Sequence, residues 1–349
     1  MKESIHRTIK EAARSLSRKL LQLPVSTLGI SSYNHRYLNE KIGMIDAIMD
    51  IYSRQLYLVL KDYNSDLKNF VWVDYGGGSG IFSLLAKEAG VGTVIYNDIY
   101  DVSCADVSKT SKALNIAIDH IVCGDTDSLV TYIQKHSITI NAITSFDVIE
   151  HIYNIEEHFG KLAYLQTAPF TMVYGSGANP ENNWKVKAIT KIQMADEYED
   201  LTKTWGHKER DTLQSFLAVR RNIIQSCAPQ LSGADADYLA KATRGLIKED
   251  IEKCVVEFLA KGDISYKMEH PTNTCDPLTG NWSEHLMDLY LLEKYLQNLG
   301  FRAEVSPGYY PINGPWINQG IKSIINTWIK LRKRKGMLLA PYYWVVAKK

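Results

Sequence analysis

The sequence predicts a doubly wound α/β domain that carries helical additions. From Phe70 onward, short β-prone runs alternate with amphipathic helical stretches for about a hundred residues. A cluster of glycines separates the first of these runs from its helix. Such alternation is typical of βαβ units with a parallel sheet and right-handed crossovers. In such a sheet, ligands bind at the carboxyl ends of the strands.

The expected elements follow one another in a regular order. Strands are predicted within 70–73, 93–100, 118–125, 141–151 and 169–176, with helices at 81–89, 101–114, 128–136 and 155–164 between them. The segment 178–283 interrupts this alternation. The alternation then resumes with an amphipathic helix at 287–301 and strands within 302–310 and 337–349. We therefore expect the α/β domain to consist of 70–177 and 284–349.

Two segments fall outside this alternation. Residues 1–69 show helical spacing of apolar positions, interrupted by Pro24 and by Ser31 and Ser32, and predict a helical cover at the N-terminus. Residues 178–283 contain helical stretches separated by polar ones, and we interpret them as a helical insertion that forms an acceptor-binding cap.

The composition excludes several classes of protein. With 349 residues, 45% hydrophobic and 23% charged, the chain is typical of a globular protein longer than one domain. A net charge of +1 argues against a dedicated nucleic-acid binder. Five cysteines without a C-x-x-C pair indicate neither a disulfide framework nor a cysteine zinc site. We expect a cytoplasmic protein, because no apolar run is long enough to span a membrane.

The glycine cluster lies where such a sheet would bind a ligand. Asp74 and then Gly76, Gly78 and Gly80 follow the first strand and precede a helix, and glycines there let the backbone approach a ligand closely. The spacing departs from G-x-G-x-x-G, because Ile81 occupies the third glycine position. An acidic residue beside the loop repels a pyrophosphate but suits an ammonium or sulfonium group, which favours S-adenosylmethionine over NAD.

Acidic residues also end the next strands. Asp98 ends the second strand, where a carboxylate can accept hydrogen bonds from ribose hydroxyls. Asp125 closes the third strand, where it can accept from an adenine amino group. The fourth strand ends in Ser145-Phe146-Asp147-Val148-Ile149-Glu150-His151.

Together these motifs resemble the class I S-adenosylmethionine-dependent methyltransferases, in order and in spacing. The fourth-strand motif is most similar to the small-molecule enzymes related to the ubiquinone, menaquinone and sugar methyltransferases. The resemblance covers 70–175 and extends to 284–349, and it implies a seven-stranded Rossmann-like sheet. It implies that Asp74, Gly76, Gly78, Gly80, Asp98, Asp125, Thr126, Phe146 and Arg36 bind S-adenosylmethionine. In this assignment Arg36 pairs with the methionine carboxylate, and Phe146 and Asp147 border the transferable methyl group.

His151 is the expected general base, with Asp147 beside it as the second catalytic candidate. It follows the fourth strand at the carboxyl edge of the sheet, and an imidazole titrates near neutral pH. Local packing of a histidine at a helix start is the alternative. We assign no metal, although Asp147, Glu150 and His151 offer two carboxylates and an imidazole to Mg²⁺. His207 and His285 are interpreted as structural or solvated, with acceptor contact as the alternative.

The resulting hypothesis is methyl transfer to an oxygen of a small-molecule, saccharide or lipid-linked acceptor, without nucleic acid as a partner. The alternatives are an NAD-dependent oxidoreductase and a non-catalytic interaction protein that retains the fold. The apolar, basic segment 321–336 could contact an anionic ligand or the inner face of a membrane, although cations at a helix C-terminus also explain its charge. The sequence does not indicate the oligomeric state.

Overall fold

The chain folds into two compact units. The structure, a computed structural model, describes residues 2–165, 169–201, 211–313 and 316–349. Unit 1 consists of Met1–Val148, Glu156–Ser176 and Leu289–Lys349, and unit 2 consists of Ile149–Ile155 and Gly177–Asp288. Unit 2 thus takes in a short segment after the fourth strand in addition to the region that corresponds to the expected insertion.

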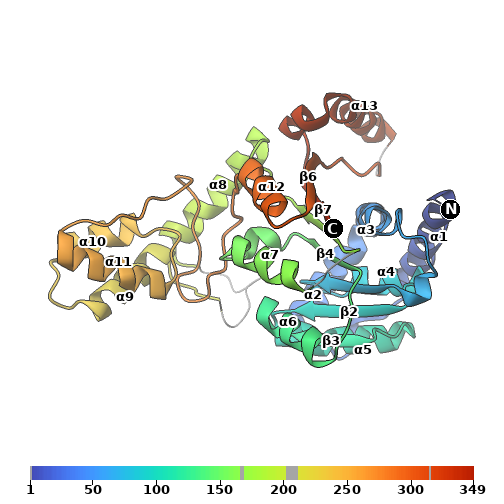
Figure 1. Cartoon of the computed structure of the whole chain (residues 1–349), viewed down its shortest axis with the longest axis horizontal. Coiled ribbons are helices and arrows are strands. Elements are labelled where there is room, and N and C mark those ends of the chain that lie inside the picture. The colour runs from blue at the N-terminus through green and yellow to red at the C-terminus, as the bar shows by residue number, and fades with distance from the viewer. Residues whose placement is uncertain (1, 166–168, 202–210, 314–315) are drawn as a thin grey trace. The chain divides into compact units, whose positions relative to one another are not determined.

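Unit 1 contains a seven-stranded sheet, which confirms the predicted fold class (Figure 1). Its strands are β1 (Val71–Tyr75), β2 (Thr93–Asp98), β3 (His120–Cys123), β4 (Ala142–Phe146), β5 (Thr171–Ser176), β6 (Arg302–Pro307) and β7 (Tyr343–Lys348). The order across the sheet is β3-β2-β1-β4-β5-β7-β6. The first five strands are parallel, and β7 runs antiparallel to both β5 and β6.

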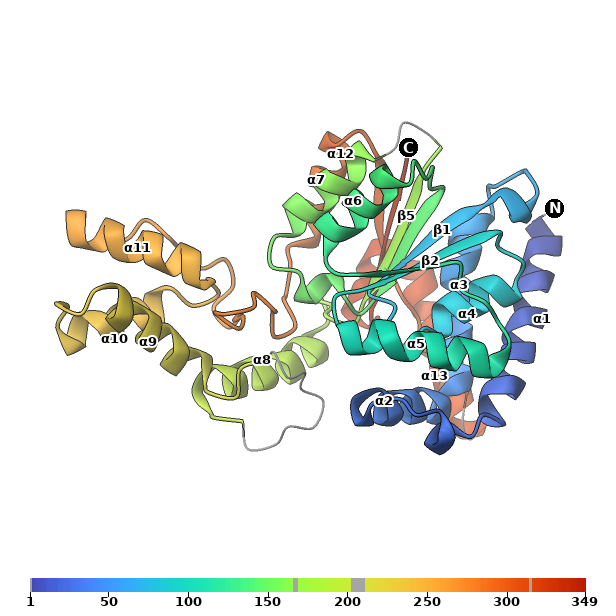
Figure 2. The same cartoon turned by 90° about the horizontal axis from the view of Figure 1, so that it is seen from below.

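Helices cover both faces of this sheet. The helices α4 (Ile81–Glu88) and α5 (Asp101–Leu114) lie on one face, and α6 (Thr126–Lys135), α7 (Ile155–Tyr164) and α12 (Leu289–Asn298) lie on the other (Figure 2). Because both faces are covered, the central strands bury nearly every side chain, and Trp72, Tyr96 and Tyr174 are among the largest side chains that are fully buried.

The N-terminal segment forms the three helices α1 (Lys2–Leu21), α2 (Ser32–Gly43) and α3 (Ile45–Leu60). The breaks fall where the sequence predicts them: a short 3-10 turn follows Pro24, and the Ser31 side chain caps α2 by accepting from the Asn34 N–H. Helix α1 packs on α3 and α4, and its apolar face joins the core under the sheet.

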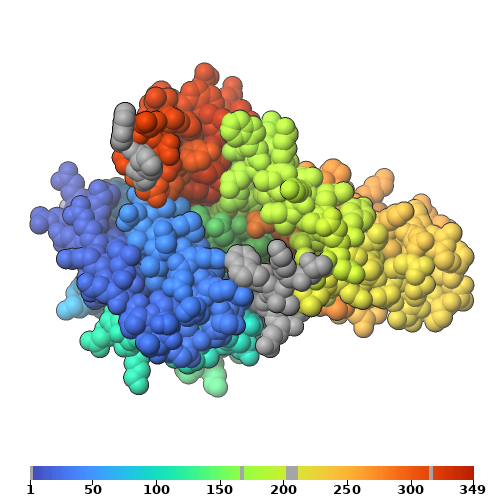
Figure 3. Space-filling view, turned by 180° about the vertical axis from the view of Figure 1, so that it is seen from behind, coloured from blue at the N-terminus to red at the C-terminus, as the bar shows by residue number. Residues whose placement is uncertain are grey.

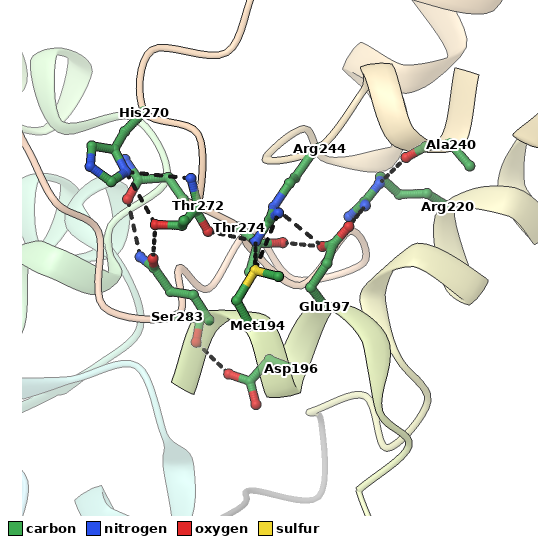
Figure 4. A network of polar contacts seen from close by, with 12 residues as sticks. Met194, Asp196, Glu197, Arg220, Ala240, Arg244, His270, Thr272, Thr274 and Ser283 are labelled. Atoms are coloured by element: carbon green, nitrogen blue, oxygen red, sulfur yellow. Dashed lines mark hydrogen bonds and ion pairs between the residues drawn. The ribbon is translucent and has the colours of Figure 1, made fainter. Parts of the chain in front are cut away.

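Unit 2 is helical, with α8 (Asn183–Tyr198), α9 (Phe216–Cys227), α10 (Gly233–Ala242) and α11 (Lys248–Lys261). Helix α9 packs against the other three. Beside its apolar core lies a buried ion cluster, in which Arg220 pairs with Glu197 and Arg244 lies 3.7 Å from the same carboxylate (Figure 4). Arg220 also donates to the Ala240 carbonyl, and Thr274 donates to Glu197.

The C-terminal part of unit 1 adds a helix outside the sheet layers. Helix α13 (Trp316–Arg332) runs into the 3-10 turn η4 (Lys333–Leu338) just before β7. Among the described helices, none combines the length and the apolar character that a membrane span requires.

Candidate active site

The candidate site lies in unit 1, at the carboxyl edge of the sheet, where the strand order reverses between β1 and β4. Strands β1 and β4 are neighbours, but the chain leaves them toward opposite faces, which makes this edge the ligand-binding position of such sheets. Asp147 follows β4 in a left-handed conformation with φ of +54°. Its N–H donates to the Gly175 carbonyl over 2.9 Å. A left-handed residue other than glycine is uncommon and is concentrated at functional sites.

The glycine loop after β1 packs closely against the rest of unit 1. Gly76 has a φ of +69°, and a Cβ atom there would lie 2.5 Å from Val148. Equivalent atoms on Gly80 and Gly78 would lie 2.3 Å from Val107 and 3.1 Å from Tyr37. Side chains of the protein itself therefore occupy the space that these glycines leave. The sequence pattern predicts the glycines for close approach of a ligand, whereas packing and positive φ already require them.

Asp98 links the end of β2 to this loop. Its Oδ2 accepts from the Gly78 N–H over 2.8 Å, and its Oδ1 accepts from the Tyr100 N–H over 2.8 Å. An ionised carboxylate has about four acceptor positions, so about two remain for a ligand. These remaining acceptor positions fit the predicted role, in which the carboxylate accepts hydrogen bonds from the two ribose hydroxyls of S-adenosylmethionine.

Asp74 is buried beneath the loop. Its Oδ2 accepts from the Ser83 hydroxyl of α4 over 2.7 Å. Burial raises the pKa of Asp74 to about 7, the Ser83 hydrogen bonds act against this rise, and the nearby Asp98 carboxylate adds to it. The side chain is therefore poised between its neutral and charged forms at physiological pH.

Asp125 and Thr126 begin α6 and have partners within unit 1. Asp125 caps the helix by accepting from the Ser128 N–H and hydroxyl over 3.0 and 2.9 Å. Thr126 lies 2.9 Å from the Tyr75 hydroxyl and 2.7 Å from Nδ1 of His158. The adenine contact assigned to both residues stays a prediction.

His158 was not predicted from the sequence as a site residue. It lies at the centre of a chain of hydrogen bonds that also contains Thr126 and Tyr174. Its Nε2 lies 3.0 Å from the Tyr174 hydroxyl, and burial, with a smaller contribution from Lys161, lowers the pKa of His158 to about 3. The neutral ring donates with one nitrogen and accepts with the other, so it fixes a single direction along Tyr75, Thr126, His158 and Tyr174. The only signal in the sequence was that His158 precedes Leu162 by four residues, which places it on the apolar face of α7 and indicates a buried histidine.

Sequence reasoning also missed a polar cluster that α2 and α3 bring to the site. The Lys41 ammonium lies 5.1 Å from the centre of the Tyr37 ring. Burial acts to lower the pKa of Lys41, but Tyr52, Tyr37 and the Asp147 carboxylate act in the opposite direction and the net pKa is raised. Lys41 therefore carries a full positive charge close to Asp147. Arg36, predicted to bind the methionine carboxylate, lies beside Tyr37 on α2, and its role stays a prediction.

A buried carboxylate fixes the position of α2. Asp106 on α5 accepts from the Ser31 N–H over 2.8 Å and from the Asn34 amide over 2.9 Å, and it pairs with Lys109 over 2.9 Å. Burial opposes ionisation, but these hydrogen bonds outweigh it and lower the pKa of Asp106. The hydrogen bonds from Ser31 and Asn34 to Asp106 thus hold the start of the helix that places Tyr37 against Gly78.

Phe146 lies in an aromatic cluster next to this edge. Its ring centre is 6.2 Å from that of Tyr52, 5.5 Å from that of Tyr342 and 5.6 Å from that of Trp344. The Gln55 amide donates to the Ser145 and Val173 carbonyls over 2.8 Å each and so bridges β4 and β5. These ring contacts fix the orientation of the Phe146 side chain, one residue before Asp147.

His151 belongs to unit 2, in the short segment Ile149–Ile155 that connects β4 to α7. Its Nδ1 lies 2.8 Å from the Trp282 carbonyl, which can only accept, so Nδ1 carries the proton. Nε2 is left as the basic nitrogen and lies 4.0 Å from a Glu284 carboxylate oxygen. Single ligand atoms of Glu150, His151 and Glu284 lie within 4.8 Å of one another, a set that could hold a divalent ion. This set contains Glu284 in place of the Asp147 considered from the sequence.

The other two histidines considered for acceptor contact have different outcomes. The His285 ring stacks on Trp282 with centres 4.2 Å apart, and burial lowers the pKa of His285 to about 4, which fits a structural role. His207 lies outside the described residues.

Comparisons with known proteins find similarity to methyltransferases over part of the sequence. No protein-family model matches the chain. Over 94 residues, 26% of its length, the chain is 34% identical to a ribosomal protein L11 methyltransferase from Helicobacter acinonychis. The aligned part spans 27% of that relative.

Solved structures of methyltransferases align with the chain at low identity. The plantazolicin methyltransferase BpumL in complex with SAH is 11% identical to this chain, with a TM-score of 0.41. The alignment covers 98% of this chain and 99% of the BpumL chain. An S-adenosylmethionine-dependent methyltransferase from Mesorhizobium loti is 12% identical to this chain, with a TM-score of 0.39. That alignment covers 84% of this chain and 98% of the Mesorhizobium chain.

Proposed function

We propose that this chain is an S-adenosylmethionine-dependent methyltransferase that methylates an oxygen of a small-molecule, saccharide or lipid-linked acceptor. One observation carries the proposal: Asp98, the glycine loop and the buried Asp74 meet at the carboxyl edge of β1 and β2. Bound S-adenosylmethionine would supply an electrophilic sulfonium methyl group. The local similarity to a methyltransferase sequence supports the same activity.

Charged residues of the site are suited to different parts of S-adenosylmethionine. Asp98 is suited to hold the ribose hydroxyls, and Asp74 in its ionised form suits the methionine ammonium. Lys41 offers a cation for the methionine carboxylate, a task that the family resemblance assigns to Arg36. The acidic loop would repel the pyrophosphate of NAD, which disfavours the oxidoreductase alternative.

The acceptor assignment is supported by features of each unit. In unit 1, Phe146 is the last residue of β4, and Asp147, with its left-handed backbone, follows it directly. In unit 2, an open cavity of about 640 Å³ has both polar and apolar walls, lined by side chains such as Asn222, Ile223, Lys248 and Leu278. Mixed walls of this kind suit a compact, partly polar molecule. We propose that unit 2 selects the acceptor and that His151 removes its proton.

Replacing Asp98 by Ala tests cofactor binding. The variant should bind S-adenosylhomocysteine about 10- to 150-fold more weakly, because a charge-assisted hydrogen bond contributes about 1.5–3 kcal/mol. Isothermal titration calorimetry of the full chain measures the loss. Asp119→Ala is the matched control, because Asp119 also accepts from a backbone N–H of β2, that of Val94, at the opposite end of the strand.

The same titration separates the alternatives. Binding of S-adenosylhomocysteine with no response to NAD or NADP supports the proposal, and the reverse result would establish the oxidoreductase. Wild-type protein that binds neither would indicate the non-catalytic alternative. A panel of phenols, sugars and lipid-linked alcohols, followed by release of S-adenosylhomocysteine, then identifies the acceptor.

Replacing Asp74 by Asn should separate stability from cofactor binding. The folded-state pKa of Asp74 is raised, so the stability that its carboxyl group contributes is present below about pH 4 and is lost as the pH rises through about 7. Above pH 7 the cofactor-free Asn variant should therefore be more stable than wild type, by roughly 2–4 kcal/mol. Urea unfolding at pH 5 and pH 8 measures the difference.

Cofactor affinity should show the opposite trend. Between about pH 5.5 and 7.5, wild-type affinity should rise with pH because only ionised Asp74 attracts the ammonium group, and the Asn variant should bind weakly at every pH. Equal pH dependence in both proteins would show that Asp74 is not the ammonium partner.

A further inference from the structure

Helix α13 carries an apolar stripe on its outer face. Ile317, Ile321, Ile324, Trp328 and Leu331 follow the spacing i, i+4, i+7, i+11, i+14, which places them along one side of a helix. The exposed fractions of the four aliphatic residues are 56%, 52%, 73% and 76% in chain order. We call these five residues the α13 outer face. A continuous exposed stripe of this kind indicates an interaction surface.

The opposite side of α13 is fixed to unit 1. The Asn326 amide exchanges two hydrogen bonds of 2.8 Å with the backbone of Tyr310, and the Lys322 ammonium donates to Asn313 over 2.7 Å. Ile329 is 3% exposed, and a Cβ atom on Gly336 would lie 2.5 Å from its carbonyl oxygen. Since these contacts fix the rotation of the helix, the outer face cannot turn inward to join the core.

Cations lie next to this stripe. The Arg332 guanidinium lies 5.4 Å from the centre of the Trp328 ring, at the edge of the outer face. Lys330, Lys333 and Lys335 are also exposed, and none of these four cations has a carboxylate partner among the ion pairs of the described residues. Two more exposed apolar side chains, Leu338 and Leu339, follow the cations directly.

The C-terminal sequence that forms this surface is basic. The last acidic residue is Glu304, and the 45 residues after it contain eight basic ones, which are Lys322, Lys330, Arg332, Lys333, Arg334, Lys335, Lys348 and Lys349. Figure 3 shows this C-terminal part of the chain, in orange-red to dark red, gathered in one lobe of the molecule. In the fold, Glu293 of α12 already pairs with Arg334 over 3.2 Å. A second copy of the same face would therefore offer the other cations little counter-charge, whereas an anionic bilayer offers both acyl chains and phosphates.

We propose that the α13 outer face and the adjoining cations dock this protein on an anionic membrane surface. The helix lies in the plane of the interface, with its aliphatic stripe among the upper acyl chains and Arg332, Lys333 and Lys335 at the phosphates. The Trp328 ring, with Arg332 over it, is suited to the boundary between these two layers. This inference does not depend on the proposed methyltransferase activity.

Vesicle sedimentation of the full chain tests the proposal. Binding should be at least about tenfold stronger to phosphatidylcholine vesicles that contain about 30% phosphatidylglycerol than to phosphatidylcholine alone, and about 0.5 M salt should weaken it. Ile324→Asp with Leu331→Asp should abolish binding, and Lys333→Glu with Lys335→Glu should reduce it about tenfold or more. Val256→Asp, on an exposed apolar position of α11, is the matched control and should bind like wild type.

Two further measurements keep the result decisive. Each variant must keep its wild-type melting temperature, and vesicles should shift tryptophan emission to shorter wavelength in wild type but much less in Trp328→Phe. No binding by the folded wild type overturns the proposal. Binding that the charge variants lose but the Asp variants keep overturns it in favour of a soluble anion. A dimer in light scattering that Ile324→Asp dissociates, without vesicle binding, shows that a second copy covers the face.

Discussion

Glu197→Gln is expected to destabilise unit 2 by about 3–5 kcal/mol, because removing one partner of a buried ion pair leaves an uncompensated charge. Glu197 is 1% exposed and faces two cations, Arg220 at 0% and Arg244 at 5%. The glutamine keeps the shape and the hydrogen bond from Thr274 but removes the negative charge that both guanidinium groups share. The cluster joins α8, α9 and the segment that contains Arg244, so its loss should loosen all three.

Urea unfolding followed by circular dichroism measures this change, and hydrogen exchange of the α9 amides assigns it to unit 2 rather than to the sheet. The matched control is Asp237→Asn. Asp237 pairs with Arg221, the neighbour of Arg220 on α9, but both side chains are exposed, so the expected change is about 0.5 kcal/mol or less. Equal effects of the two substitutions would contradict a role for burial in the cluster.

The sheet could be predicted from the sequence because its strands are local. Each central strand is a short β-prone run bounded by polar or glycine residues, as in Val71–Tyr75 and Thr93–Asp98, and each helix between them has its own apolar periodicity. Asp74, the last residue but one of β1, and Asp98, the last residue of β2, follow directly from those boundaries. The positions of Asp74 and Asp98 at one edge of the sheet therefore follow from local sequence patterns alone.

The remaining site residues depend on contacts between distant segments. Lys41 and Tyr37 lie on α2, and the start of this helix is held by Asp106, about 70 residues later in the chain. His158 gains its role from partners on β1, α6 and β5, which no local pattern reveals. Glu284 likewise joins His151 from a position more than a hundred residues away. Such long-range juxtapositions leave no periodic trace in a single sequence.

His151→Ala is expected to lower the rate of methyl transfer about 10²- to 10⁴-fold, the usual contribution of a general base, while the affinity for S-adenosylhomocysteine stays unchanged. The structure supports this choice because Nδ1 donates to the Trp282 carbonyl and leaves Nε2 as the basic nitrogen. Turnover is measured as release of S-adenosylhomocysteine with the acceptor that the panel identifies. His136→Ala, an exposed histidine at the end of α6, is the matched control and should keep wild-type turnover.

Two additions to this assay distinguish a base from a metal ligand. If His151 is the base, free imidazole should restore part of the turnover of His151→Ala, and a chelator should leave the wild type active. If Glu150, His151 and Glu284 hold a divalent ion, the chelator should stop the wild type and added Mg²⁺ should restore it, with Glu284→Gln as impaired as His151→Ala. Wild-type turnover in His151→Ala would contradict both roles, since each requires the imidazole nitrogen.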